Sequence, residues 1–145
     1  NSHVIPGLIR RFYEAKLEKK DEVIIWGSGN AKREFLHVDD MASASLFVLD
    51  LPKPDYEIIT EPMLSHINVG SGFDISIMEL ATKISSATGF LGQIKTDPSK
   101  PDGAPRKLLD VTRLTKMGWT PKINLESLIV QTYKWFEDNI NYFRQ

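Results

Sequence analysis

The sequence predicts a mixed α/β fold. Along its 145 residues, short apolar runs typical of strands alternate with longer segments whose apolar residues follow the spacing of a helix. Glycines and prolines separate these segments, and neither an internal repeat nor a low-complexity linker interrupts them. The length suits one domain with its own core, and 41% hydrophobic and 26% charged residues are ordinary for a globular chain.

The first predicted elements are a helix and two strands. Ser2 is expected to cap the helix, because its hydroxyl can accept hydrogen bonds from the first amides. The helix carries one apolar stripe, made of Val4, Ile5, Leu8, Ile9 and Phe12. Residues 23–26 predict a short buried strand, and residues 34–38 predict a second strand.

The middle of the chain is expected to contain a helix, a loop and a strand. Asp39 or Asp40 is expected to cap the helix, which spans about residues 41–49. Residues 51–63 contain three prolines and predict a loop, and residues 66–69 predict a strand.

Local signals are clearest in the second half of the chain. Ser76 and Glu79 have the spacing of a capping box, and the helix that they begin is expected to end near Gly89. The remaining predicted elements are a strand at residues 93–96, a short helix at residues 111–117 and a final amphipathic helix capped by Asn124.

Composition limits the classes of function. With 18 basic and 19 acidic side chains the formal net charge is -1, so no overall attraction to nucleic acid or anionic membranes is expected. The chain has no cysteine, which excludes disulfides and a cysteine nucleophile within it and fits a cytoplasmic location. His37 and His66 have no second ligand nearby in the sequence, so no metal site is expected. No apolar run reaches the roughly 18–20 residues that span a bilayer.

Two basic loops suggest that the chain binds a diphosphate. Residues 99–107 form a turn-rich loop, stiffened by Pro101 and Pro105, that ends in an adjacent arginine and lysine. Residues 26–33 form a glycine-containing loop that also ends in two cations. Such loops place positive charge against phosphate groups, and two of them fit an anion with two negative groups, such as a nucleotide pyrophosphate.

Five segments carry a resemblance to a known family: residues 1–6, 26–29, 33–42, 62–70 and 100–110. In this order, and over essentially the whole chain, they resemble the C-terminal part of the GDP-L-fucose synthase family, in the extended short-chain dehydrogenase/reductase superfamily. The Arg-x-Phe-x-x-Val-x-Asp core of residues 33–40 is shared by many nucleotide-sugar epimerases and dehydratases. A much narrower group of proteins combines the Lys-Pro-Asp-Gly-x-Pro-Arg-Lys loop with the starting Asn-Ser-His-Val-Ile-Pro.

The resemblance implies that residues 1–145 form the small mixed α/β, GDP-sugar-binding lobe of such an enzyme, lacking most of its Rossmann lobe. The intact enzymes convert GDP-4-keto-6-deoxy-D-mannose to GDP-L-fucose by 3,5-epimerisation and NADPH-dependent 4-reduction. The resemblance also implies NADP(H), bound mainly by an N-terminal lobe outside this chain, and a homodimer. Because the sequence begins at Asn1 without a methionine, we expect a piece of a longer chain that is inactive alone.

Five residues acquire expected roles from the resemblance. His3 matches a histidine that acts as general acid in epimerisation, a role that suits an imidazole with a pKa near 6.5. Arg11, Arg33 and Lys107 match residues that contact the GDP-sugar, mostly at its diphosphate. Trp26 matches a residue that lines the same site. Asp102 and Arg106 receive no firm role.

Plain structural alternatives to these roles stay open. They are a solvent-exposed terminus for His3, a solvated helix face for Arg11, an ion pair with Glu34 or Asp39 for Arg33, and core packing for Trp26. Residues 70–72 read Gly-Ser-Gly after an apolar run, but the dinucleotide fingerprint is incomplete, which favours a tight turn over a phosphate cradle. No tyrosine has a lysine four positions on, so hydride transfer is not expected of this chain alone.

Two alternative functions remain at this point. One is the substrate lobe of a different nucleotide-sugar epimerase or dehydratase, which would share the Arg-x-Phe-x-x-Val-x-Asp core. The other is a non-catalytic nucleotide-sugar binding module.

Overall fold

The computed structural model describes residues 3–143 and confirms the mixed α/β class. Its helices are α1 (Val4–Leu17), α2 (Val38–Leu49), α3 (Lys53–Ile58), α4 (Ile77–Thr88), α5 (Thr112–Lys116) and α6 (Leu125–Asn139), followed by the 3-10 helix η1 (Ile140–Phe143). Its strands are β1 (Glu22–Trp26), β2 (Lys32–Glu34), β3 (Asp74–Ser76), β4 (Gln93–Asp97) and β5 (Arg106–Lys107).

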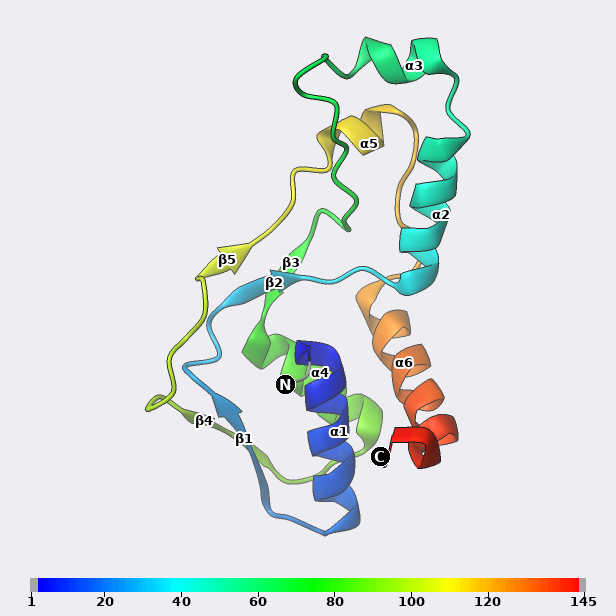
Figure 1. Cartoon of the computed structure of the whole chain (residues 1–145). Helices are drawn as coiled ribbons and strands as arrows, with labels where there is room; N and C mark the ends of the chain where they lie inside the picture. The colour runs from blue at the N-terminus through cyan, green and yellow to red at the C-terminus, as the bar shows by residue number, and fades with distance from the viewer. Residues whose placement is uncertain (1–2, 144–145) are drawn as a thin grey trace.

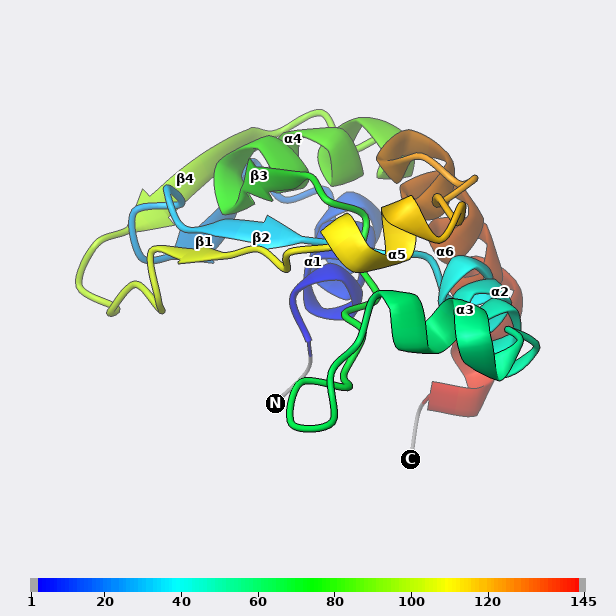
Figure 2. The same cartoon turned by 90° about the horizontal axis from the view of Figure 1, so that it is seen from above.

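The strands form two small sheets (Figure 1). In the first sheet β1 runs parallel to β4, with Ile24 beside Lys95 and Trp26 beside Asp97. In the second sheet β2 lies in the middle, antiparallel to β3 and parallel to β5. The second sheet lies between two helical regions of the molecule, which Figure 1 shows above and below it. Figure 2, seen from above, shows β1, β2 and β4 on one side of the molecule and α2 and α6 on the other.

The lower region of Figure 1 consists of α1, β1, α4, β4 and α6 around the main core. Helix α1 packs on α4, and α4 packs on α6. Phe12, Leu80 and Ile129 are at most 1% exposed, and the ring of Phe12 meets that of Phe90 edge to face with centroids 5.5 Å apart. The helices thus enclose Leu8, Ile9 and Phe12 of the apolar stripe predicted for the first helix, whereas Val4 at its start is exposed.

Strand β1 is only half buried, so the prediction of a buried strand is wrong for one of its faces. Val23 and Ile25 point into the main core, whereas Ile24 and Trp26 are exposed. The reason is the alternation of a strand, since helices cover one face of the two-stranded sheet.

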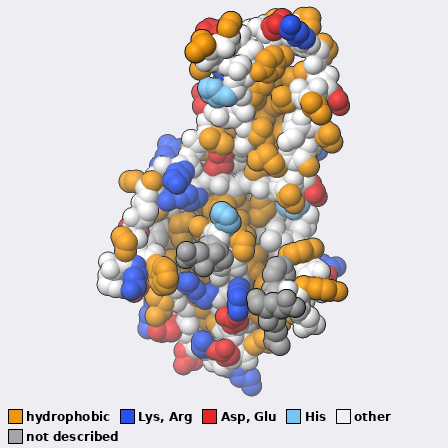
Figure 3. All heavy atoms as spheres, viewed as in Figure 1, with side chains coloured by type: hydrophobic (Ala, Val, Ile, Leu, Met, Phe, Trp, Pro, Cys, Tyr) orange, Lys and Arg blue, Asp and Glu red, His pale blue; other side chains and the backbone are white. Residues whose placement is uncertain are grey.

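The upper region consists of α2, α3, α5 and residues 59–70, and it has a smaller second core. Ala44, Leu114 and Trp119 are buried there, and the indole of Trp119 donates a hydrogen bond to the Ser43 hydroxyl at 3.2 Å. Many apolar side chains in this region remain exposed, and Figure 3 shows them gathered over it. They include Val38, Leu46, Leu49, Ile58 and Met63.

Several predicted elements and caps are confirmed. The capping box of Ser76 and Glu79 begins α4, and Gly89 ends it in the left-handed conformation at φ 70°. The side chain of Asn124 accepts from the amide of Ser127 and begins α6. The N-cap residue of α1 is His3, and the predicted cap Ser2 lies outside the described residues.

The predicted strand at residues 34–38 and its following cap are wrong. Strand β2 already ends at Glu34, and α2 begins at Val38, three residues earlier than expected. The imidazole of His37 accepts from the amide of Asp39 and so acts as the cap. Asp40 is instead buried, because its carboxylate accepts hydrogen bonds from the amides of Lys122 and Ile123.

Two further predictions in the upper region are wrong. Residues 51–63 contain the short helix α3, since prolines at the first turn of a helix cost little. Residues 66–69 form no strand in the described chain. Their backbone has other partners, for example Arg113, whose guanidinium donates to the carbonyl oxygens of Leu64 and His66.

Candidate functional site

Arg33 and Lys107 come together on neighbouring strands. They are register partners in the parallel pair of β2 and β5, so their side chains project from the same face of the sheet. Parallel strands lie about 4.8 Å apart, which puts the backbones of the two residues side by side. Two long cationic side chains that start from neighbouring positions on one face can reach the same anion.

The guanidinium of Arg33 is held by carbonyl oxygens. Its Nη1 donates to the carbonyl of Lys32 at 2.6 Å and to that of Ala104 at 2.7 Å. The alternative ion pair with Glu34 or Asp39 is absent from residues 3–143. The positive charge of Arg33 is therefore oriented without being neutralised by those carboxylates.

Arg11 and Trp26 form a second pair, at the end of β1. The guanidinium carbon of Arg11 lies 5.7 Å from the centroid of the Trp26 ring, within the range of a cation–π interaction. Nη1 of Arg11 also donates to the carbonyl of Ile24 at 2.6 Å. Trp26 is 66% exposed, which rules out core packing, and Arg11 is more than a solvated helix residue.

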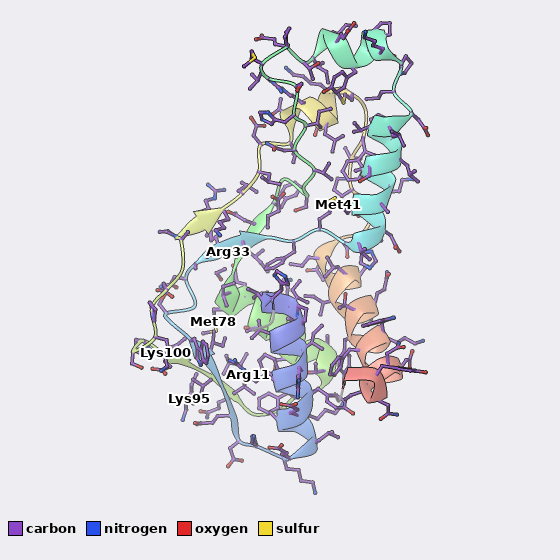
Figure 4. All side chains as sticks on the ribbon, viewed as in Figure 1. Arg11, Arg33, Met41, Met78, Lys95 and Lys100 are labelled. Carbon is purple, nitrogen blue, oxygen red and sulfur yellow. The ribbon has the colours of Figure 1, made fainter. Side chains whose placement is uncertain are left out.

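Additional cations lie on the same flank as Arg11. Figure 4 shows Lys95 and Lys100 to the left of α1, on β4 and on the loop that follows it. Lys95 stands beside Ile24 on the exposed face of the first sheet and forms an ion pair with Glu22. In the sequence, Lys95 is marked only by its position two residues before Asp97, which places both on one face of the strand. The register of β1 and β4 was needed to show that this is the exposed face.

His3 stands apart from these pairs, at the start of α1. Its side chain is exposed and makes no capping hydrogen bond, while its carbonyl accepts from the amide of Gly7 at 3.0 Å. Eight residues separate it from Arg11, or about 12 Å along a helix. An exposed imidazole at this place is free to reach a ligand.

Arg106 and Lys107 differ in their partners. Arg106 forms an ion pair with Asp74 at 2.5 Å, and its guanidinium holds the pKa of that carboxyl below the ordinary value. Lys107 is exposed on the opposite face of β5. The structure thus gives Arg106, which received no firm role from the sequence, a partner within the sheet.

The Gly-Ser-Gly turn at residues 70–72 holds a carboxylate. The amide of Gly72 donates to Oε1 of Glu34 at 2.6 Å, and the amide of Leu109 donates to Oε2 of the same side chain at 3.0 Å. An amide occupied by Glu34 is not offered to a pyrophosphate, so this turn does not fit a nicotinamide dinucleotide. The tight-turn interpretation agrees with this geometry.

Two hollows lie near these elements. A depression of about 690 Å³ at the C-terminal ends of α1 and α4 is lined by Lys16, Lys19 and Lys20 and holds none of the five candidate residues. Lysines there balance the negative ends of helices. A cavity of about 440 Å³ lies against the second sheet, lined by Arg33, Phe35 and residues 121–126.

Residues 3–143 contain neither a helix that could cross a membrane nor a cluster of side chains that could hold a metal ion. No helix there has both the length and the apolar character needed to cross a membrane. No three or more His, Asp or Glu side chains of that part gather as ligands for a metal ion.

Comparisons with known proteins give the family context. The model of the NAD dependent epimerase/dehydratase family matches residues 1–70. The chain is 54% identical over 144 residues to GDP-L-fucose synthase of Escherichia coli strain K12, covering 99% of this chain and 45% of that protein. It is 48% identical over 140 residues to the putative GDP-L-fucose synthase 2 of Arabidopsis thaliana, covering 97% and 40%. The chain thus spans less than half the length of these relatives.

Solved structures show the same fold. A GDP-mannoheptose C4 reductase from Campylobacter jejuni with NADP bound is 33% identical with a TM-score of 0.81, covering 94% of this chain and 45% of that one. A GDP-L-fucose synthetase from Naegleria fowleri is 26% identical with a TM-score of 0.81, covering 99% and 42%. In sequence and in fold, the chain therefore corresponds to part of the GDP-L-fucose synthases of the extended short-chain dehydrogenase/reductase superfamily, as its motifs predict.

Proposed function

We propose that this chain is the GDP-sugar-binding part of an enzyme that converts GDP-4-keto-6-deoxy-D-mannose to GDP-L-fucose. The reaction comprises 3,5-epimerisation and NADPH-dependent 4-reduction. The observation that carries the proposal is the 54% identity, over nearly the whole chain, to the E. coli GDP-L-fucose synthase.

Arg33, Lys107 and Arg11 bind the diphosphate in this proposal, and Trp26 lines the same site. The side-by-side placement of Arg33 and Lys107 and the contact of Arg11 with Trp26 support it. Fixing the diphosphate holds the sugar carbons beside the catalytic groups, and such positioning can supply several kcal/mol of barrier reduction, on the order of 7–11 at best.

His3 is proposed as the general acid of epimerisation. It donates a proton to a carbon next to the 4-keto group, after a base outside this chain has removed one from the opposite face. Its exposure at the start of α1 supports access to a ligand. A well-placed proton donor of this kind contributes about 10²–10⁴-fold in rate.

The rest of the proposed enzyme is a Rossmann lobe that precedes residue 1 and binds NADP(H), within a cytoplasmic homodimer. The exposed apolar side chains of the upper region support a covering partner, and residues 66–69, which pair with no strand within residues 3–143, lie there too. The NADP-bound structure of the similar C. jejuni reductase supports the choice of cofactor. Since the Gly-Ser-Gly turn does not fit the dinucleotide and no tyrosine of this chain has a lysine four positions on, hydride transfer is assigned to that lobe.

A reductase of another GDP-sugar is the second candidate. The chain is 38% identical to GDP-L-colitose synthase of Yersinia pseudotuberculosis and 33% identical to the C. jejuni GDP-mannoheptose C4 reductase. Assaying GDP-4-keto-6-deoxy-D-mannose beside other GDP-4-keto sugars and UDP-sugars separates these activities. Binding of GDP without turnover of any of them would favour the non-catalytic binding module.

The test uses the product of the whole gene, with GDP-4-keto-6-deoxy-D-mannose and NADPH as substrates. We expect NADPH oxidation with formation of GDP-L-fucose, and a KM about tenfold higher in each of Arg33→Ala and Lys107→Ala. Arg11→Ala is compared with Arg10→Ala, since Arg10 is its neighbour and pairs with Glu14 in solvent. Unchanged KM values in all three site variants would show that the assigned site is wrong.

The role of His3 is tested separately. His3→Asn should lower kcat by at least about 100-fold while leaving the Kd of GDP unchanged. Equal losses in GDP affinity and kcat would contradict a role confined to proton transfer.

A further inference from the structure

A hydrogen-bonded aspartate and serine connect the two basic loops. Asp102 lies in the loop between β4 and β5, and Ser28 lies just after β1, 74 residues away in sequence. The amide of Ser28 donates to Oδ1 of Asp102 at 2.9 Å, and its hydroxyl donates to Oδ2 at 2.7 Å. One carboxylate thus fixes both the backbone and the side chain of the opposite loop.

The loop fixed in this way carries the partners of the proposed diphosphate ligands. Two residues after Asp102, the carbonyl of Ala104 accepts from Nη1 of Arg33. The next carbonyl, that of Pro105, accepts from the amide of Lys32 at 2.8 Å, after which the loop becomes β5 and presents Lys107. A shift of Asp102 would therefore move both cations relative to each other.

Gly27 makes the close approach of the two loops possible. Its φ is +78°, and a Cβ at this position would lie 2.2 Å from Oδ1 of Asp102. Only glycine leaves room for the carboxylate in this backbone conformation.

The charge of Asp102 is otherwise unfavourable here. A carboxylate close to a diphosphate site repels the ligand. Electrostatics alone therefore predicts that a neutral residue in place of Asp102 would strengthen binding. The two hydrogen bonds from Ser28 supply the structural reason for its presence.

We propose that Asp102 and Ser28 are positioning residues for GDP-sugar binding, which hold the loop of residues 98–105 so that Arg33 and Lys107 face one diphosphate together. This inference rests on the proposed function. It assigns Asp102 no contact with the ligand.

A double-mutant cycle on the whole gene product tests it, with GDP as the probe and calorimetry as the measurement. Ser28→Ala and Asp102→Ala should each raise the Kd of GDP about tenfold, and the double variant should be no weaker than the weaker single variant. Asp102→Asn should retain most of the affinity, because its side-chain oxygen still accepts from the Ser28 amide and its NH2 group can donate to the Ser28 hydroxyl, so that both hydrogen bonds are kept. The thermal unfolding midpoint of each variant should stay near that of the wild type.

Ser99→Ala is the matched control. Its hydroxyl also donates to an aspartate, Oδ1 of Asp97 at 2.6 Å, but within a single turn of the same loop. This variant should bind GDP as the wild type does.

The alternatives give different results. If Asp102 contacts the ligand itself, Ser28→Ala has little effect and the two losses multiply in the double variant. If Asp102 acts only through its charge, Asp102→Ala binds GDP more tightly. Either result overturns the inference while the proposed function stands. A wild-type protein that does not bind GDP would contradict both the inference and the proposed function.

Discussion

The lower and upper regions of the molecule differ in how completely they bury their apolar residues. In the lower region α1, α4 and α6 enclose Phe12, Leu80 and Ile129 almost fully. The upper region buries Ala44, Leu114 and Trp119, yet Leu49 and Ile58 are each 79% exposed. Both regions have similar apolar side chains, so the difference lies in the number of elements available to cover them.

This difference distinguishes a lower region with a large, closed core from an upper region whose core is smaller and leaves much of its apolar surface exposed. Burial of apolar surface stabilises the folded state by roughly 25 cal/mol per Å². The exposed side chains of the upper region do not make this contribution within this chain. Contiguous exposed apolar patches usually mark interaction surfaces. The comparison therefore agrees with the proposal that a further lobe covers the upper region.

The largest expected effect is in the main core. Phe12→Ala should reduce the free energy of unfolding by about 3–5 kcal/mol, because Phe12 is fully buried and the three helices around it cannot collapse into the cavity. Chemical denaturation of the whole gene product measures this. A loss below about 1 kcal/mol would mean that the lower region is not held by this core.

The second core should respond less. Leu114→Ala is expected to cost about 2 kcal/mol, at the lower end of the range for buried leucines, since few elements surround it and can relax. The same denaturation experiment compares it with Phe12→Ala. Equal losses for the two variants would contradict the distinction between the regions.

An exposed leucine in each region tests for a covering lobe. Leu49→Ala should destabilise the whole gene product by about 1–2 kcal/mol if the proposed lobe outside this chain buries its side chain. Leu91, 98% exposed in the lower region, provides the control, and Leu91→Ala should change stability by less than about 0.5 kcal/mol. If Leu49→Ala is equally neutral, the upper surface is not covered there.

The smallest effect concerns the sheet between the regions. The hydrogen bond from Arg106 holds the pKa of Asp74 below its ordinary value. Its contribution to stability is therefore complete above about pH 4, the unfolded pKa, and is lost as the pH falls through the lower folded pKa. Asp74→Asn should lower the unfolding midpoint by about 2 °C at pH 7, and the difference should shrink as the pH falls through the lowered folded pKa of Asp74. A pH-independent difference would exclude this ion pair as its cause.

The predictions that succeeded depend on neighbouring residues. Ser76 and Glu79 form their capping box within one turn of α4, and Asn124 caps α6 through an amide three residues on. Gly89 ends α4 because glycine accepts the left-handed conformation there without strain. Each of these contacts can be inferred from spacing alone.

The predictions that failed depend on distant partners. Asp40 matches the pattern of a cap, but its carboxylate accepts hydrogen bonds from the amides of Lys122 and Ile123, more than 80 positions away. Residues 66–69 have the composition of a strand, yet no strand within residues 3–143 pairs with them. For the candidate site, the resemblance named Arg33 and Lys107 individually, whereas their pairing came from the register of β2 and β5.

The sequence by itself determined the α/β class, most helix boundaries and the family resemblance. These follow from side-chain periodicity, caps and short motifs, which act within a few residues of each other. Only the tertiary structure decided that Arg106 pairs with Asp74, whereas Lys107 has no ion pair within residues 3–143, and that Asp102 reaches Ser28. The reason is physical: local hydrogen bonds are set by spacing, whereas contacts across dozens of residues depend on how helices and strands pack.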